Sequence, residues 1–249
     1  MRRYKYPLIN TLVLAITLFV NYISNTGAIN GKTIGEVSGE YSSLLTPAGY
    51  AFSIWGVIYL ALTALVIYQW IIAASANKSH DALHKVGFML AAANILNCFW
   101  VVLWLNGMIA FTVVLMIAIL ITLTRLTIDL AKWQTKSQRD YWFVKFPIYI
   151  YQGWIIVALV ANIAALLTSI SFNFLFAGTI WAILVIAIAF GINVFQTIRL
   201  KQVASAIIGV WGIVAIGVKQ LSTAHSVSVA AFTASGLLAL FVLNLLGGE

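Results

Sequence analysis

The sequence predicts an all-α integral membrane protein, and three observations support this fold class. Of the 249 residues, 63% are hydrophobic and only 8% are charged, whereas soluble domains carry about 25% charged residues. The 14 Phe, 10 Tyr and 9 Trp argue against disorder, because disordered chains are poor in aromatic residues. The apolar residues form continuous runs of about twenty, which is the length of a membrane-spanning helix. A transmembrane β-barrel would instead alternate apolar and polar residues.

Eight apolar runs are long enough to be spanning helices. Only Asn106 and Gly107 separate the third run from the fourth, so these two runs should form a helical hairpin. Residues 25–49 form the longest connection and are rich in Gly, Ser and Thr; a loop of this length is usually functional. The eight runs cover residues 8–24, 50–73, 86–105, 108–130, 146–169, 174–197, 203–220 and 227–246.

The basic residues predict the orientation of these spans. A cytoplasmic N-terminus gives that side twelve Lys and Arg and leaves Lys32 and Lys219 on the other side, as the positive-inside rule requires. We therefore expect eight spans in the inner or plasma membrane of the cell, with both termini cytoplasmic. The net charge of +8 then needs no nucleic-acid partner. The twelve are Arg2, Arg3, Lys5, Lys78, Lys85, Arg125, Lys132, Lys136, Arg139, Lys145, Arg199 and Lys201.

The start of the chain has a second interpretation. Basic residues before a short apolar run are also typical of a secretory signal. No convincing small-x-small cleavage site follows at residues 21–28, so we expect the first run to be a retained helix.

Uncharged polar residues are common inside the runs, whereas charged ones are rare. Asn94 and Asn97 lie three apart on one helical face, and Trp100 and Trp104 continue that face. An Asn in lipid needs a partner, so these side chains should point into the protein, either as structural contacts between helices or as the polar groups of a pocket. No carboxylate lies in mid-membrane, which argues against a proton- or sodium-coupled carrier. Further polar candidates are Gln152, Asn162 and Asn193.

The sequence shows no catalytic or metal-binding constellation. The single cysteine, Cys98, excludes an internal disulfide framework and a thiolate cluster. There is no phosphate-binding glycine loop, nucleophile elbow or metalloprotease helix. Small residues four apart, at Ser205 and Gly209 and again at Ala231 and Ser235, indicate close packing of the seventh and eighth runs.

Three stretches carry a family resemblance. Residues 47–55, PAGYAFSIW, followed by Tyr59, are similar to a family's second-helix start, with two prolines, an aromatic residue, Phe and then Trp and Tyr one turn apart. Ala48 replaces the second proline, and the spacing from Phe to Trp is one residue shorter. Residues 97–107 contain NCFW followed by another aromatic residue and a glycine. The third stretch has Trp154 and Asn162 at the family's spacing of eight, whereas Pro147 lies about one turn further from the Trp than usual.

Together these stretches resemble the TspO/translocator-protein family, also called tryptophan-rich sensory proteins, over about residues 8–168. The resemblance implies a five-helix bundle in residues 1–170. Residues 171–249 would then be three additional transmembrane helices that pack on this bundle as part of one structural unit.

The resemblance also implies a function. Family members bind flat hydrophobic ligands such as porphyrins, heme and, in some branches, sterols, in a pocket beneath the first long loop. No cofactor is expected to be required, and a porphyrin or heme is the candidate ligand. Some relatives are linked to porphyrin breakdown, for which Trp would supply the only candidate chemistry here. The residues carried over as ligand-binding are Tyr50, Phe52, Trp55, Asn97, Trp100 and Trp154.

We expect Trp55 and Trp154 to line one pocket, with residues 25–49 closing over it. Counting depth along each helix from Tyr50 and from Phe146 at about 1.5 Å per residue, in a core about 30 Å thick, places the two indoles about 10 Å apart in depth. A macrocycle could span that separation, whereas one small ligand could not stack on both.

Two other functions stay open. A small-solute transporter is one, although no paired halves with broken helices are visible. The other is a non-catalytic structural subunit of a membrane assembly, in which the polar Asn residues would be dispensable. The oligomeric state is also open, with a homodimer among the alternatives.

Overall fold

The computed structural model describes residues 2–75, 81–135, 137–171 and 178–247, and these residues are helical apart from short connections. Turns of 3₁₀ helix at Arg2–Tyr4 and Gly49–Ser53 precede α1 and α3, and one π-helical turn at Tyr141–Lys145 joins α7 to α8. The α-helices are α1 (Lys5–Ser24), α2 (Ile34–Glu40), α3 (Ile54–Ala74), α4 (Asp81–Val86), α5 (Met89–Leu105), α6 (Ile109–Lys132), α7 (Gln138–Asp140), α8 (Phe146–Ser169), α9 (Thr179–Leu200), α10 (Val203–Lys219) and α11 (His225–Gly247).

Seven of the helical stretches in the described residues are long and apolar enough to cross a membrane. These seven correspond to the first six runs and the eighth run of the sequence. The seventh run is α10, which is apolar but has only 17 residues. At about 1.5 Å per residue it is about 26 Å long, slightly less than the hydrocarbon core. The expected start of the sixth run, Phe174, lies outside the described residues, and α9 begins at Thr179.

Two glycines shape the third and fourth spans. Gly87 has a φ of +52°, which costs little only for glycine, and it separates α4 from α5. The helical hairpin expected at Asn106 and Gly107 is confirmed, because Gly107 turns the chain with a φ of +70° directly before α6. The third span, Asp81–Leu105, therefore consists of two helices and begins five residues before the predicted run, and the turn that follows it is tight.

The long connection of residues 25–49 contains a helix that its composition did not predict. Helix α2 begins after Thr33, whose hydroxyl accepts a hydrogen bond from the Glu36 amide while the Glu36 carboxylate accepts one from the Thr33 amide at 2.7 Å. This capping box satisfies two backbone donors at the helix start. The same hydrogen bonds from Thr33 hold the pKa of the Glu36 carboxyl below its usual value. Lys32, just before the helix, forms an ion pair of 2.7 Å with Glu40, the last residue of the helix.

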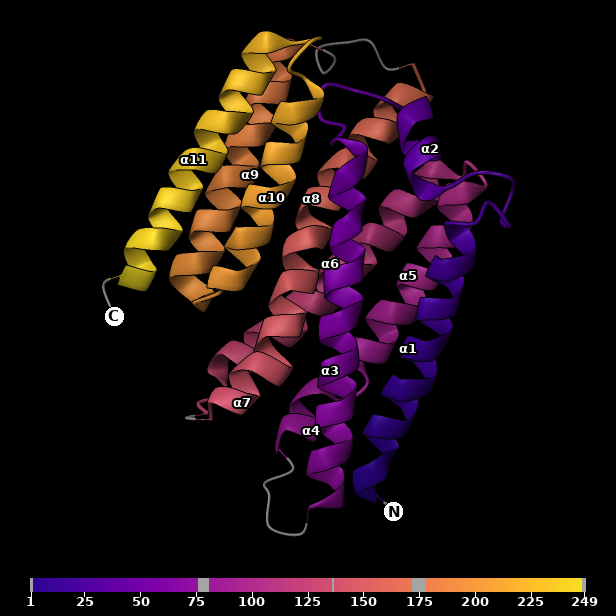
Figure 1. Ribbon diagram of the computed structural model, residues 1–249, viewed down its shortest axis with the longest axis vertical. Coiled ribbons are helices and arrows are strands. Elements are labelled where there is room, and N and C mark those ends of the chain that lie inside the picture. Colours follow the sequence, from indigo (N-terminus) through magenta and orange to yellow (C-terminus); the bar gives the residue numbers. More distant parts are fainter. Residues whose placement is uncertain (1, 76–80, 136, 172–177, 248–249) are drawn as a thin grey trace.

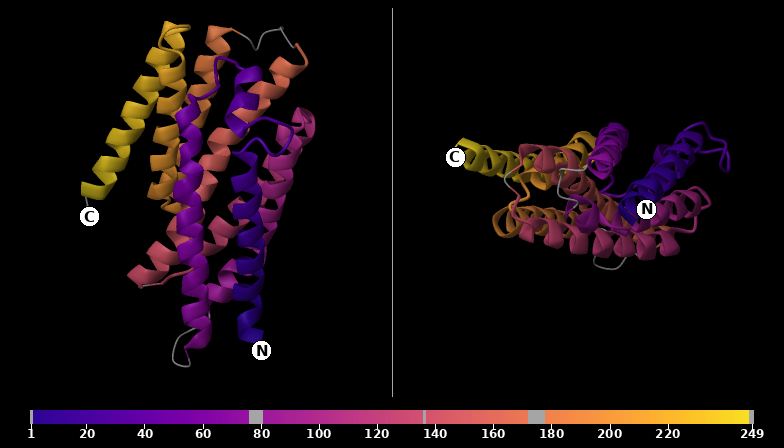
Figure 2. Two further views of the ribbon diagram at one scale, coloured as in Figure 1. Left: turned by 45° about the vertical axis from the view of Figure 1, so that its right-hand side comes forward. Right: turned by 90° about the horizontal axis from the view of Figure 1, so that it is seen from below.

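The helices form two adjoining groups (Figures 1 and 2). Helices α1, α3, α5, α6 and α8 share one hydrophobic core, and α9, α10 and α11 stand beside them with a second, smaller core. Helix α10 joins the groups because it packs against α8 and contributes Ala204, Ile208 and Ala215 to the first core. The free ends of α1 and α11 both lie away from the end of the bundle that carries α2 (Figure 1).

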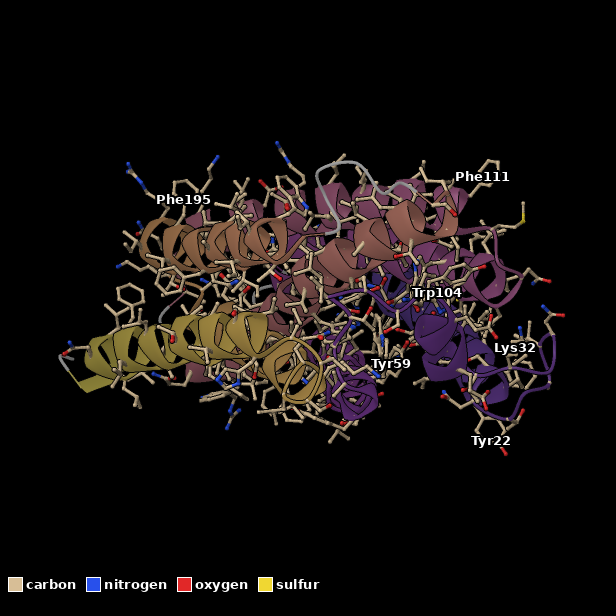
Figure 3. The ribbon with its side chains drawn as sticks, turned by 90° about the horizontal axis from the view of Figure 1, so that it is seen from above. Tyr22, Lys32, Tyr59, Trp104, Phe111 and Phe195 are labelled. Atoms are coloured by element: carbon tan, nitrogen blue, oxygen red, sulfur yellow. The ribbon has the colours of Figure 1, made fainter. Side chains whose placement is uncertain are left out.

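Many large apolar side chains of the membrane-spanning helices point outward, and many polar side chains point into the protein. Seen from above, Phe111 and Phe195 project from the margin, whereas Trp104 lies among the helices (Figure 3). Helix α1 buries a polar face that includes Asn10, Thr17 and Asn21, and it leaves its apolar face outward. Buried amides of this kind can bond across helices, so α1 is anchored by polar contacts rather than by an apolar stripe.

Candidate functional site

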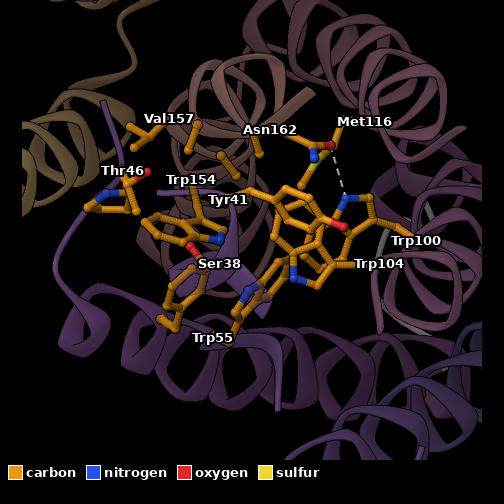
Figure 4. A pocket seen from close by; sticks show the side chains of 15 residues that line it. Ser38, Tyr41, Thr46, Trp55, Trp100, Trp104, Met116, Trp154, Val157 and Asn162 are labelled. Atoms are coloured by element: carbon orange, nitrogen blue, oxygen red, sulfur yellow. Dashed lines mark hydrogen bonds between the residues drawn. The ribbon is translucent and has the colours of Figure 1, made fainter. Parts of the chain in front are cut away.

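The candidate site is a cavity enclosed by α3, α5, α6 and α8 and covered by residues from the 25–49 connection (Figure 4). Four buried tryptophans from three helices form much of its wall, and α6 contributes Met116. The lining residues are Ser38, Tyr41, Thr46, Pro47, Phe52, Trp55, Trp100, Trp104, Met116, Trp154, Val157, Ala158, Ala161, Asn162 and Ala165.

The structure brings four of the six predicted ligand-binding residues to this cavity. Phe52 and Trp55 come from the start of the second span, Trp100 from α5 and Trp154 from α8. Phe52 and Trp154 contact edge to face with ring centroids 6.1 Å apart. The cover predicted for residues 25–49 lies over the cavity, through Ser38 and Thr46 among others.

The other two predicted residues lie elsewhere. Tyr50 does not line the cavity; it is 43% exposed and packs edge to face on Trp211 of α10, with centroids 5.3 Å apart. Asn97 is fully buried between α1, α3 and α5, where its Oδ1 accepts hydrogen bonds from Asn21 and from the Tyr59 hydroxyl, both at 3.3 Å. The inward orientation of Asn97 is therefore confirmed, but its amide joins helices rather than facing the cavity.

The predicted depth difference between Trp55 and Trp154 is wrong. Their ring centroids lie 6.4 Å apart, with the rings almost perpendicular at 81°. The error comes from counting α8 from Phe146, because the helical run begins at Gln138, eight residues earlier. Eight helical residues add about 12 Å to the depth of Trp154, and this removes the difference in depth of about 10 Å that was predicted from the sequence. A single ligand of moderate size could therefore contact both indoles.

Three indole N–H groups at the cavity differ in their hydrogen bonding. Trp100 Nε1 donates to Asn162 Oδ1 at 3.3 Å (dashed in Figure 4), and Trp104 Nε1 donates to the Ile34 carbonyl at 3.2 Å. Trp154 is 1% exposed, and its Nε1 has no hydrogen-bond partner among the described residues. Figure 4 shows this nitrogen near the middle of the cluster of lining side chains. A buried donor without a partner costs free energy, so it indicates a group that a ligand or water completes.

Asn162 supports the opposite wall. Its Oδ1 accepts from Trp100, and its Nδ2 donates to Thr112 Oγ1 of α6 at 3.0 Å. Thr112 in turn donates to the Ile109 carbonyl at 2.6 Å. One amide therefore links α5, α6 and α8 and holds the Trp100 ring in place; Trp100 also stacks on Trp104 with centroids 5.4 Å apart.

Sequence reasoning placed several lining residues outside the site. Trp104 and Asn162 were singled out by helical spacing but were not assigned to the pocket, although each lies on the same helical face as an assigned Trp. Ser38 and Tyr41 belong to the α2 region, which composition treated as a loop, so no periodic signal pointed to them. Met116 lies on α6, which contains none of the three stretches that carry the family resemblance, so it was not assigned to the pocket.

The cavity is small in this conformation. Its free volume is about 30 Å³, enough for about two water molecules, whereas drug-sized ligand pockets measure about 300–1,000 Å³. A larger hollow of about 560 Å³ lies between α1, α2 and α3 on the other side of Phe52 and Trp55, which line both spaces. Phe52 and Trp55 therefore lie between the two spaces.

The lining of the cavity is aromatic and uncharged. The described residues contain no group of three or more His, Cys, Asp or Glu that could hold a metal ion. The lining has no charged side chain, so its recognition chemistry consists of aromatic faces, indole N–H groups, the Asn162 amide and a few hydroxyl groups.

Comparison with known proteins agrees with this architecture. A family model described as TSPO-like protein matches residues 7–244. The match extends beyond the residues that carry the resemblance and includes α9, α10 and most of α11. No match was found among curated proteins or among solved structures. Because the family match spans nearly the whole of this all-helical chain, the protein belongs to the family of TSPO-like proteins.

Proposed function

We propose that this TSPO-like membrane protein binds a flat hydrophobic ligand, such as a porphyrin or another tetrapyrrole, in the tryptophan-lined cavity. The observation that carries the proposal is the buried Nε1 of Trp154, which has no hydrogen-bond partner in the described part of the chain and lies within a wall of four indoles. Indole faces suit a planar conjugated ligand, and a single N–H suits a carboxylate or carbonyl oxygen on its edge.

Binding requires the cavity to enlarge. A tetrapyrrole cannot enter about 30 Å³, so the ligand must displace the cover or use the neighbouring hollow behind Phe52 and Trp55. The cover is a short helix and an irregular segment rather than a spanning helix, so it is the element that can move at least cost.

The test compares two Trp→Phe variants in titrations of purified protein with protoporphyrin. The dissociation constant is read from the shift of the porphyrin absorption band, which does not depend on the number of tryptophans. Trp154→Phe keeps an aromatic ring but removes the free donor, so we expect about tenfold weaker binding, the effect of losing one hydrogen bond to a carboxylate.

The matched control is Trp142→Phe, because Trp142 is 55% exposed and does not line the cavity. We expect this control to bind as the wild type does. Equal affinities of all three proteins, or no band shift with wild-type protein, would contradict the proposal. That result would leave a solute carrier or a structural subunit as the remaining function.

We also propose the topology and division of the chain. The described part has seven long apolar helices and the shorter α10, and we propose that all eight cross the membrane with both termini cytoplasmic. Two of the residues behind this orientation, Lys78 and Lys136, lie outside the described residues. Residues 1–170 would form the ligand-binding bundle, and 171–249 would pack on it within one structural unit, as the α8–α10 contact supports.

Cysteine labelling of intact cells tests the orientation. With Cys98 replaced by alanine, Ser42→Cys and Ser137→Cys place single thiols at exposed positions in the outer connection and in the segment between α6 and α8. A membrane-impermeant maleimide should label Ser42→Cys and spare Ser137→Cys until the cells are permeabilised. The reverse pattern would overturn the orientation.

A further inference from the structure

Helix α10 is hydrogen-bonded to the segment that leads into α3, which we call the strap and define as residues 43–51. The Ala48 amide donates to the Ala215 carbonyl at 2.9 Å. Trp211 Nε1 donates to the Ala51 carbonyl at 3.2 Å, and Gln220 Nε2 donates to the Ser43 carbonyl at 3.2 Å. These three bonds connect residues more than 150 positions apart and occur at the start, middle and end of the strap.

The strap is part of the cavity cover. Thr46 and Pro47 line the cavity, and Phe52 follows directly after the strap. On the side away from the cavity, the Tyr50 ring of the strap packs on the Trp211 ring of α10. The strap therefore lies between the tryptophan-lined cavity and α10.

Helix α10 is itself held closely to α8. A Cβ atom on Gly153 of α8 would lie 2.7 Å from the Ser205 carbonyl of α10, and one on Gly212 of α10 would lie 2.5 Å from Val157 of α8. Such short approaches fix the position of one helix along the other. Helix α8 carries Trp154. Because α10 contacts both the strap and α8, it fixes the position of the cavity cover relative to the cavity wall.

We propose that Trp211 of α10 and Gln220, which directly follows α10, are positioning residues that fasten the strap over the cavity, so that the C-terminal helices control access to it. The link with ligand access rests on the proposed function. The fastening itself does not, and it can be measured without a ligand.

The experiment measures how often the cover opens. In a Cys98→Ala background, Ser38→Cys reports on the cavity, because Ser38 lines it and is only 8% exposed. The labelling rate with a water-soluble maleimide is compared in detergent with and without Trp211→Phe and Gln220→Leu. Each substitution removes the donor and keeps an aromatic or aliphatic side chain; Gln220→Leu also removes the Oε1 atom that accepts a hydrogen bond from Thr223 Oγ1.

We expect the double substitution to accelerate labelling of Ser38→Cys about tenfold, which corresponds to about 1.4 kcal/mol and to the combined effect of two neutral hydrogen bonds. Trp211→Phe alone should give about a threefold increase. The control reporter is Ser235→Cys, which is buried at 3% exposure in α11. Its labelling rate should not change.

Two results would overturn the proposal. One is an unchanged labelling rate of Ser38→Cys in the double variant, and the other is an equal acceleration of both reporters, which would indicate general loosening. Porphyrin titration separates this inference from the proposed function. Faster labelling in a protein whose wild type binds no porphyrin would support the fastening of the strap and reject the ligand.

Discussion

Gly153→Ala is expected to lower the free energy of unfolding by about 1–3 kcal/mol, the range for inserting a methyl group into a well-packed contact. The new Cβ would lie 2.7 Å from the Ser205 carbonyl oxygen and 3.0 Å from the Ser205 Cα. Both are backbone atoms, so no rotamer change can relieve the clash, and α8 and α10 must separate. Because Trp154 is the next residue, we also expect weaker ligand binding.

The matched control is Gly191→Ala in α9, where no atom lies within 4 Å of the added Cβ. Alanine is the better helix former, so this variant should be unchanged or slightly more stable. The measurement is equilibrium unfolding in detergent, followed by circular dichroism. Similar stabilities of the two variants would show that α8 and α10 do not meet closely at Gly153.

Asn162→Leu is expected to lower the free energy of unfolding by about 1–2 kcal/mol, the range for an interhelical hydrogen bond in model membrane peptides. The substitution removes the acceptor of Trp100 Nε1 and the donor to Thr112 Oγ1. The Thr112 hydroxyl keeps its bond to the Ile109 carbonyl, whereas the buried Trp100 N–H is left without a partner. The Trp100 ring should therefore become mobile, and ligand affinity should fall with stability.

The control uses the same substitution at a second buried amide. Asn94 is fully buried in α5, but neither of its side-chain polar atoms has a hydrogen-bond partner among the described residues. Asn94→Leu therefore removes an amide without breaking a bond and should destabilise the protein less than Asn162→Leu. An equal or larger loss at Asn94 would show that burial, rather than the hydrogen bonds of Asn162, determines the cost.

The sequence alone predicted the membrane helices and much of the cavity wall. A helix that crosses the bilayer needs about twenty apolar residues whatever its neighbours are, so hydropathy located the spans to within a few residues, except that the helical run of the fifth span begins eight residues before Phe146. Helical periodicity placed Asn94, Asn97, Trp100 and Trp104 on one face of α5, and all four are buried. Such features depend on the chain locally, and the local sequence is sufficient to predict them.

The α2 region shows where composition was not enough. A segment rich in Gly, Ser and Thr is typical of a loop, yet Thr33 and Glu36 form a capping box and start a helix of seven residues. The capping pattern was present in the sequence, but a short polar helix has no apolar periodicity. Ser38 and Tyr41 could therefore not be assigned to the cavity in advance.

Only the tertiary structure decided which faces meet. The small residues predicted close packing of α10 with α11, which is confirmed, because a Cβ on Gly217 would lie 3.3 Å from that of Ala231. The partners of two of them were not predicted, since Ser205 meets Gly153 of α8 and Gly209 meets Asn193 of α9. Trp55 and Trp154 are neighbours because the helical run of α8 begins at Gln138, and Trp211 reaches the Ala51 carbonyl across 160 positions of sequence. Hydropathy describes how each helix meets lipid. The contacts between helices depend instead on the position of one helix along its neighbour, which is set by the few side chains and glycines that allow two backbones to approach.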